Sequence, residues 1–297
     1  MRVWSVVPVV LVATLAACGG SSTPSTPVGG AGGAASGPSA SSTSAGNADG
    51  GAASVKPSVV SGASPGDEAG SRPVAAGTMD AAELTTNLHN AMVHKRTFKE
   101  RIVDPASTAT GTIDYGGGRP EDLRMSLTIV EGKQKILVVY VGGVAYMDMG
   151  KKVNGKTWIS SEGTDSASQQ LANLAKLLRA QASLGGAPSA FKSVKAVGKA
   201  GPTLDGVPTV VFTMKLTSKQ LVAELPAGAP ASAAAELAGK TAVRTISVGK
   251  DWLPRKVVEV VSGKGKPVTT TSTFSGWGTK LTIAAPSAAD VNGPAPA

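Results

Sequence analysis

Few residues in this sequence combine the type and the spacing that catalysis or metal binding requires. His89 and His94 lie five positions apart on a predicted helix, whereas two imidazoles that share a metal ion from one helix face lie four positions apart. Ser189 and Lys192 form the Ser-x-x-Lys pattern of serine acyl-transfer enzymes, but the partner motifs of those enzymes are absent from the sequence. Gly116-Gly117-Gly118 leads into a predicted strand and not into a helix, so it indicates a turn and not a phosphate-binding loop. We therefore predict no catalytic residue, no metal site and no cofactor.

The single cysteine, Cys18, stands where a covalent modification is expected. Met1 and Arg2 precede an apolar run from Val3 to Ala13, and small residues then lead to Leu15-Ala16-Ala17-Cys18. This arrangement resembles a bacterial lipoprotein signal peptide, which implies that the Cys18 thiol receives a diacylglycerol group and that the chain is cleaved after Ala17. The apolar run is shorter than the roughly 20 residues that span a bilayer. We therefore expect an anchor of acyl chains such as palmitate at the outer face of the cytoplasmic membrane. An ordinary secretory peptide with an incidental cysteine is the alternative.

Composition divides the rest of the chain into a tether and one domain. Residues 18–76 are mostly Gly, Ala, Ser, Thr and Pro and include no aromatic residue, so they cannot bury enough apolar surface to offset the entropy of ordering. We predict a signal peptide at 1–17, a disordered tether at 18–76 and a folded domain at 77–297 whose tail frays after Pro286. Because basic and acidic residues balance in 1–76, the net charge of +9 belongs to the domain. No nucleic-acid-binding motif accompanies this charge, so we expect no nucleic-acid partner.

Apolar residues at helical spacing predict two main helices. Leu84, Leu88 and Met92 recur every four residues after Asp80, which has capping-box spacing to Glu83. Shorter helices are predicted at 218–225 and 232–237. The second main helix is predicted to begin after an N-cap and to end at a Gly-Gly pair. Its N-cap is Asp165, its last residues precede Gly185-Gly186, and its apolar stripe comprises Leu171, Leu174, Leu177, Leu178 and Leu184.

Alternation of apolar and polar residues predicts antiparallel strands with one apolar face. The clearest examples are residues 123–130 and 207–216, and tight turns such as Asp205-Gly206 join neighbouring strands. The predicted strands are 97–104, 108–115, 123–130, 135–141, 144–149, 157–159, 193–199, 207–216, 242–249, 255–262, 267–275 and 280–283. This order of elements predicts an α+β fold with one large antiparallel sheet that helices cover on one side.

Three segments of the domain resemble a known family. Val194 to Leu216, with its Asp205-Gly206-Val207-Pro208 turn, and Val248 to Arg255, with its Leu253-Pro254-Arg255 end, are similar to hairpins of actinobacterial lipoproteins of the LolA-like superfamily, LppX/LprG type. Phe274 to Pro286 is similar to the closing strand of that family. The resemblance covers roughly residues 80–292 and consists of turn motifs. It implies a single curved antiparallel sheet, an open half-barrel, with helices over its concave face and an apolar cavity for the acyl chains of lipids or glycolipids.

Lipid binding without catalysis is the first hypothesis for this sequence. The apolar faces of the two clearest strands and the leucines of the second helix would line the cavity. These residues are Leu123, Met125, Leu127, Ile129, Leu171, Leu174, Leu178, Val210, Phe212, Met214 and Leu216. The simpler alternative is that the same side chains pack against one another and leave no cavity.

The lipid hypothesis describes a monomer that transports or presents a lipid or glycolipid, with an envelope transporter as a further partner. Two other functions stay open at this point. One is an envelope sensor or accessory protein that binds a protein partner through its basic surface or through the hairpins of Trp252 and Trp277. The other is a secreted hydrolase.

Overall fold

The computed structural model describes residues 74–152, 154–183, 191, 193–225 and 231–292. These residues belong to one compact unit of the chain. Cys18 and nearly all of the expected tether lie outside the described residues, so the anchor and the tether stay predictions.

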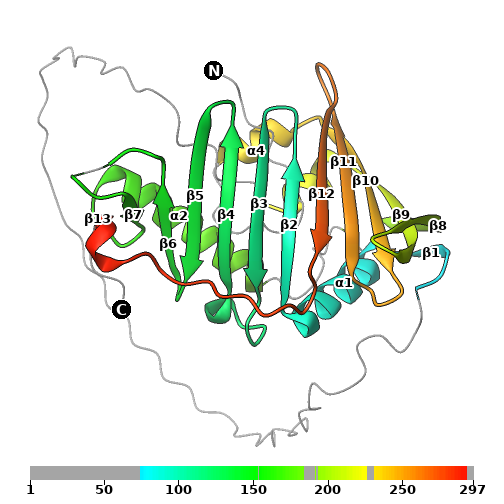
Figure 1. The fold of residues 1–297 in the computed structure, drawn as a ribbon. Helices are drawn as coiled ribbons and strands as arrows, with labels where there is room; N and C mark the ends of the chain where they lie inside the picture. Colours follow the sequence, from blue (N-terminus) through cyan, green and yellow to red (C-terminus); the bar gives the residue numbers. More distant parts are fainter. Residues whose placement is uncertain (1–73, 153, 184–190, 192, 226–230, 293–297) are drawn as a thin grey trace, which may run out of the picture. The chain divides into compact units, whose positions relative to one another are not determined.

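The described residues form a single sheet of thirteen strands (Figure 1). Every neighbouring pair is antiparallel except β7 and β13, which are parallel. The sheet begins and ends with different strands and is therefore open. In spatial order the strands are β1 (Gly77–Asp80), β8 (Lys195–Leu204), β9 (Val207–Leu216), β10 (Thr241–Gly249), β11 (Pro254–Ser262), β12 (Val268–Ser275), β2 (Thr97–Val103), β3 (Ser107–Asp114), β4 (Arg124–Glu131), β5 (Gln134–Val141), β6 (Val144–Asp148), β7 (Trp158–Ser160) and β13 (Val291–Asn292).

The helices lie on one face of this sheet (Figure 1). Helix α1 (Ala81–Lys95) contacts β1, β2 and β8, and α2 (Ser166–Ser183) contacts β6, β7 and the short 3-10 helix η2 (Pro120–Asp122). Helix α3 (Ser218–Ala223) contacts β9, β10 and α4 (Ala231–Leu237). The arrangement confirms the predicted class, which is an α+β fold with one open antiparallel sheet and helices on one of its faces.

The two main helices bury their predicted apolar stripes but differ at their N-termini. Leu84, Leu88 and Met92 of α1 are buried, as their spacing predicts. The predicted capping box of α1 is wrong, because the carboxylate of Asp80 makes no cap hydrogen bond and instead binds the Lys195 ammonium, with 2.6 Å from Oδ1 to Nζ. The β1–β8 pairing places these two residues opposite each other.

The predicted N-cap of α2 is confirmed. Oδ1 of Asp165 accepts hydrogen bonds from the backbone N–H groups of Ala167 and Ser168, each 3.0 Å long. These bonds to Ser168 and Ala167 lower the pKa of the Asp165 carboxyl, because they stabilise its charged form.

Three segments differ from the prediction at the edges and the end of the sheet. Strand β1 was not predicted, and it extends the sheet by pairing with β8. The predicted strand 280–283 is absent. Strand β12, which precedes this segment, is already paired with β11 on one side and with β2 on the other, so neither of its edges is free to pair with the segment. The tail does not fray at Pro286: Ala288–Asp290 form a 3-10 helix and Val291–Asn292 pair with β7.

Candidate functional site

The predicted cavity-lining residues of β4 and β9 all point to the face of the sheet that carries the helices, here called the inner face. Leu123, just before β4, and Met125, Leu127 and Ile129 within it are buried. The members on β9 are Phe212, Met214 and Leu216, which are buried, and Val210, which is partly buried against the same core. The alternation in the sequence therefore identified the correct face of both strands.

The predicted residues form two groups on strands that are not neighbours in the sheet. Strands β10, β11, β12, β2 and β3 lie between β9 and β4. At about 4.8 Å per strand, the two groups lie about 29 Å apart along the sheet. Both groups nevertheless belong to one hydrophobic core, and their lining of one space under the second helix stays a prediction.

Helix α2 lies near the β4 group and away from β9. Leu171 and Leu174 are buried and belong to the common core, and α2 contacts β6 and β7. The side chain of Leu178 lies outside the described residues, as does Leu184. On the opposite half of the sheet, Leu221 of α3 and Leu237 of α4 are buried in the same core.

The inner face also carries buried charges that the sequence reasoning missed. Arg244 of β10 lies between two carboxylates, Glu259 of β11 and Glu224 at the end of α3. Its Nη1 and Nη2 donate to the two carboxylate oxygens of Glu224 at 2.6 and 2.8 Å, and its Nε donates to Oε2 of Glu259 at 2.5 Å. The side chains of Arg244, Glu224 and Glu259 are only 7, 10 and 0% exposed. We call these three residues the inner triad.

Burial and charge act against each other within the inner triad. Burial raises the pKa of the Glu224 carboxyl, while the nearby Arg244 charge acts to lower it. Burial disfavours the Arg244 charge, but the two carboxylates outweigh this effect and raise the pKa of its guanidinium. The triad is therefore an ion cluster whose members depend on one another.

A further buried carboxyl, Glu100 of β2, has no such partner. Neither of its oxygens has a hydrogen-bond partner among the described residues, and the hydroxyl oxygen of the nearby Ser272 also lacks one. Burial raises the pKa of Glu100 from 4.5 to about 8, and the Ser272 hydroxyl offsets only part of this shift. Glu100 is therefore mostly protonated at neutral pH, and in that form it can donate a hydrogen bond on the inner face.

The sequence did contain a signal for these residues. Glu100 lies two residues from Phe98 and from Ile102, so it shares their face of the strand. Glu259 lies two residues from Val257 and from Val261 in the same way. Both glutamates therefore occupy positions where a strand with one buried face normally has apolar residues. A charged residue at such a position is a candidate for a buried polar site.

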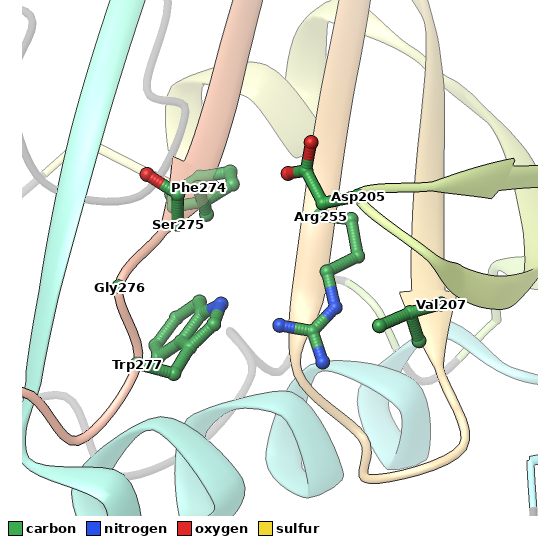
Figure 2. Close-up of a pocket in the computed structure, with 7 residues that line it drawn as sticks. All are labelled: Asp205, Val207, Arg255, Phe274, Ser275, Gly276 and Trp277. Atoms are coloured by element: carbon green, nitrogen blue, oxygen red, sulfur yellow. The ribbon is translucent and has the colours of Figure 1, made fainter.

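A separate pocket of about 350 Å³ opens where the tip of the β8–β9 hairpin approaches the ends of β11 and β12 (Figure 2). Its lining residues are Asp205, Val207, Arg255, Phe274, Ser275, Gly276 and Trp277. Trp277 stacks on Phe98, with ring centroids 4.7 Å apart. Trp252, at the neighbouring hairpin, is only 8% exposed. Both indoles therefore pack into the domain, which removes Trp252 as a contact surface for a protein partner.

Two kinds of feature are absent from the described part of the chain. No helix there is long and apolar enough to cross a membrane. No group of three or more His, Cys, Asp or Glu side chains there could hold a metal ion.

Comparison with known proteins gives matches in structure alone. No protein-family model and no curated protein matches the chain. Among solved structures, LprF from Mycobacterium bovis has 12% identity and a TM-score of 0.43, and the match covers 70% of this chain and 99% of that one. The Mycobacterium tuberculosis lipoprotein LppX has 12% identity and a TM-score of 0.39, with 68% of this chain and 97% of that one covered. A hypothetical protein from Chlamydia trachomatis has 7% identity and a TM-score of 0.33, with 70% and 97% covered.

The first two solved structures belong to the group that the hairpin motifs resemble.

Proposed function

We propose that this protein binds the acyl chains of a lipid or glycolipid against the inner face of its sheet and transports or presents them without catalysis. In this proposal a diacylated Cys18 anchors a monomer to the outer face of the cytoplasmic membrane. Residues 18–76 then let the domain reach a membrane or an envelope transporter.

The observation that supports the proposal is the chemistry of the inner face. Its two apolar groups, on β4 and on β9, consist of Leu, Ile, Val and Met side chains with a single Phe. Flexible aliphatic side chains of this kind adapt to acyl chains, which gain about 0.8 kcal/mol for each CH₂ group that leaves water. The helices on this face contact the sheet at β1, β2 and β8, at β9 and β10, and at β6 and β7, and they form none of its strand pairs. An acyl chain can therefore enter by displacing helix from sheet, without breaking strand pairs.

The proposal is tested first by what the protein carries. Organic extract of the protein, purified from the membranes of its own host without added lipid, should contain an acylated molecule near one per chain by mass spectrometry. The attached Cys18 lipid is distinguished by repeating the extraction on Cys18→Ala. An extract of Cys18→Ala without any lipid would contradict carriage of a ligand, and capture of a membrane-protein partner by crosslinking would favour the sensor function instead.

Two substitutions on β4 test the position of the ligand. Ile129→Trp adds bulk on the inner face, where Ile129 is 7% exposed, and Val130→Trp adds the same bulk on the outer face, where Val130 is 42% exposed. Displacing about two CH₂ groups should weaken binding of a fluorescent fatty acid about tenfold in Ile129→Trp. Val130→Trp should bind as the unchanged protein does. Equal affinities of the two variants, with melting temperatures that show both to be folded, would place the acyl chain elsewhere.

Cys18→Ala also tests the anchor. Without the thiol no diacylglycerol can be attached, so the protein should move from the membrane fraction into the medium. The amount in each fraction is measured by immunoblotting after fractionation. Retention of Cys18→Ala in the membrane fraction would refute the acyl anchor.

A further inference from the structure

The pocket beside Trp277 contains buried hydrogen-bond donors without acceptors. Nε of Arg255 and Nε1 of Trp277 are both buried and have no hydrogen-bond partner among the described residues. Both side chains line the pocket, and Figure 2 shows the indole nitrogen on the ring edge that faces Arg255. Because a buried donor without an acceptor costs free energy, two of them in one pocket indicate a place for a ligand that supplies acceptors.

Arg255 is held in place by groups other than a ligand. Its side chain is only 10% exposed, and its Nη2 donates to Oδ2 of Asp251 at 2.6 Å. The guanidinium lies against the backbone of Gly249, where an added Cβ would come within 3.2 Å of Nε. The side chain is therefore fixed by the Asp251 carboxylate and by the nearby backbone of Gly249, and its Nε has no acceptor among the described residues.

Trp277 is equally fixed. Its ring stacks on Phe98 and lies 6.2 Å from Phe274, centroid to centroid. The turn that carries it is tied to β2, since Gly278 donates its N–H to the carbonyl of Thr97 at 2.9 Å. The Thr97 hydroxyl in turn donates to the carbonyl of Thr279 at 2.6 Å. The indole N–H is thus presented to the pocket by a rigid frame, as a preorganised binding site requires.

The charges around the pocket favour a neutral ligand. Asp251 pairs with the Arg255 charge, and the carboxylate of Asp205 lines the side formed by the β8–β9 turn (Figure 2). Among the described lining residues the only positive charge is that of Arg255, which Asp251 pairs, whereas the lining offers N–H donors, a carboxylate acceptor and an aromatic ring. A ring that carries several hydroxyl groups matches this set, because each hydroxyl can both accept and donate. The volume of about 350 Å³ lies in the usual range for small-ligand pockets, roughly 300–1,000 Å³.

We propose that this pocket binds a single neutral sugar ring, with Arg255 Nε and Trp277 Nε1 donating to its hydroxyl oxygens and Asp205 accepting from a hydroxyl. The sugar can be free or can be the headgroup of a lipid. Only the second source rests on the proposed function.

The test uses the full chain carrying Cys18→Ala and two kinds of probe. Methyl glycosides of glucose, galactose and mannose are titrated with saturation-transfer NMR, with inorganic phosphate as the anionic comparison. Monogalactosyl diacylglycerol and diacylglycerol are compared by displacement of a fluorescent fatty acid. Trp277→Phe keeps the aromatic ring and removes its N–H, and Trp158→Phe, in β7 at the far side of the sheet, is the matched control.

If the sugar is bound free, at least one methyl glycoside should bind, and Trp277→Phe should weaken it about three- to tenfold, the loss expected for one hydrogen bond. If it is a lipid headgroup, monogalactosyl diacylglycerol should bind more tightly than diacylglycerol, and Trp277→Phe should remove this difference. Trp158→Phe should change neither result. Both variants should melt within a few degrees of the unchanged chain.

The proposal is overturned if no glycoside binds and the two lipids bind equally, or if phosphate binds in place of sugar. It is also overturned if Trp277→Phe and Trp158→Phe behave alike. Binding of diacylglycerol is read in the same assay and reports on the acyl-chain function by itself. A failed sugar site and a failed lipid function are therefore told apart.

Discussion

Arg244→Met is expected to destabilise the domain by about 3–5 kcal/mol, which is a large part of the stability of an ordinary domain. The substitution leaves Glu224 and Glu259 buried, with side chains 10 and 0% exposed, and without the guanidinium that binds both of them. Methionine fills a similar volume, so the loss reports on unpaired charge and not on a cavity. Urea unfolding at pH 7 gives the difference in unfolding free energy.

The control for Arg244→Met removes all three charges together. The triple variant Glu224→Leu, Arg244→Met, Glu259→Leu should be close to the unchanged protein in stability or above it, because replacing a whole buried ion cluster by apolar residues avoids its desolvation cost. A loss below about 1 kcal/mol in Arg244→Met alone would show that water reaches the inner triad. The inner face would then be hydrated at β10 and β11.

Glu100→Gln is expected to change how stability depends on pH. Between its ordinary pKa of 4.5 and its folded value of about 8, Glu100 is ionised in the unfolded chain but protonated in the folded one. Ionisation therefore favours unfolding in this window, and the contribution of Glu100 to stability is greatest below pH 4.5 and is lost as the pH rises to 8. The loss is about 1.4 kcal/mol per pH unit and reaches about 5 kcal/mol in total. Glu100→Gln should abolish this decline.

The measurement is the unfolding free energy of both proteins from pH 4 to pH 9. His89, whose pKa burial lowers, acts in the opposite direction, because it favours unfolding as the pH falls below 6.5. The difference between variant and unchanged protein cancels that contribution. Glu121→Gln, at a side chain 62% exposed, is the matched control and should run parallel to the unchanged protein. A difference curve for Glu100→Gln that stays flat would mean that Glu100 is solvated in the folded state.

Periodicity predicted the elements because it is a local property of the chain. The predicted strand Val207–Leu216 has the observed bounds, and Leu84, Leu88 and Met92 form the buried stripe of α1. Each side chain of a strand or helix has its face set by its own neighbours in sequence. The strands that the sequence did not predict are those that form only by pairing with a distant segment. Strand β1 pairs with β8, and β13 pairs with β7.

The candidate site residues likewise include features that the sequence predicts and features that depend on strand pairing. Alternation identified the apolar inner sides of β4 and β9, but only pairing could show that five strands separate them. The register of β10 with β11 places Arg244 opposite Glu259, and α3 then brings Glu224 to the same guanidinium. No spacing in the sequence indicates that contact.

The sequence alone determined most of the secondary structure, the inner side of β4 and β9 and, by its resemblance to a lipoprotein signal peptide, the expectation of a lipid anchor at Cys18. Only the tertiary structure decided the strand order, the inner triad, the isolated carboxyl of Glu100 and the pocket between Arg255 and Trp277. The physical reason is that side-chain direction follows from the backbone repeat of a few residues. Hydrogen-bonded pairing and charge pairing instead join groups far apart in the chain, as when β12 pairs with β2.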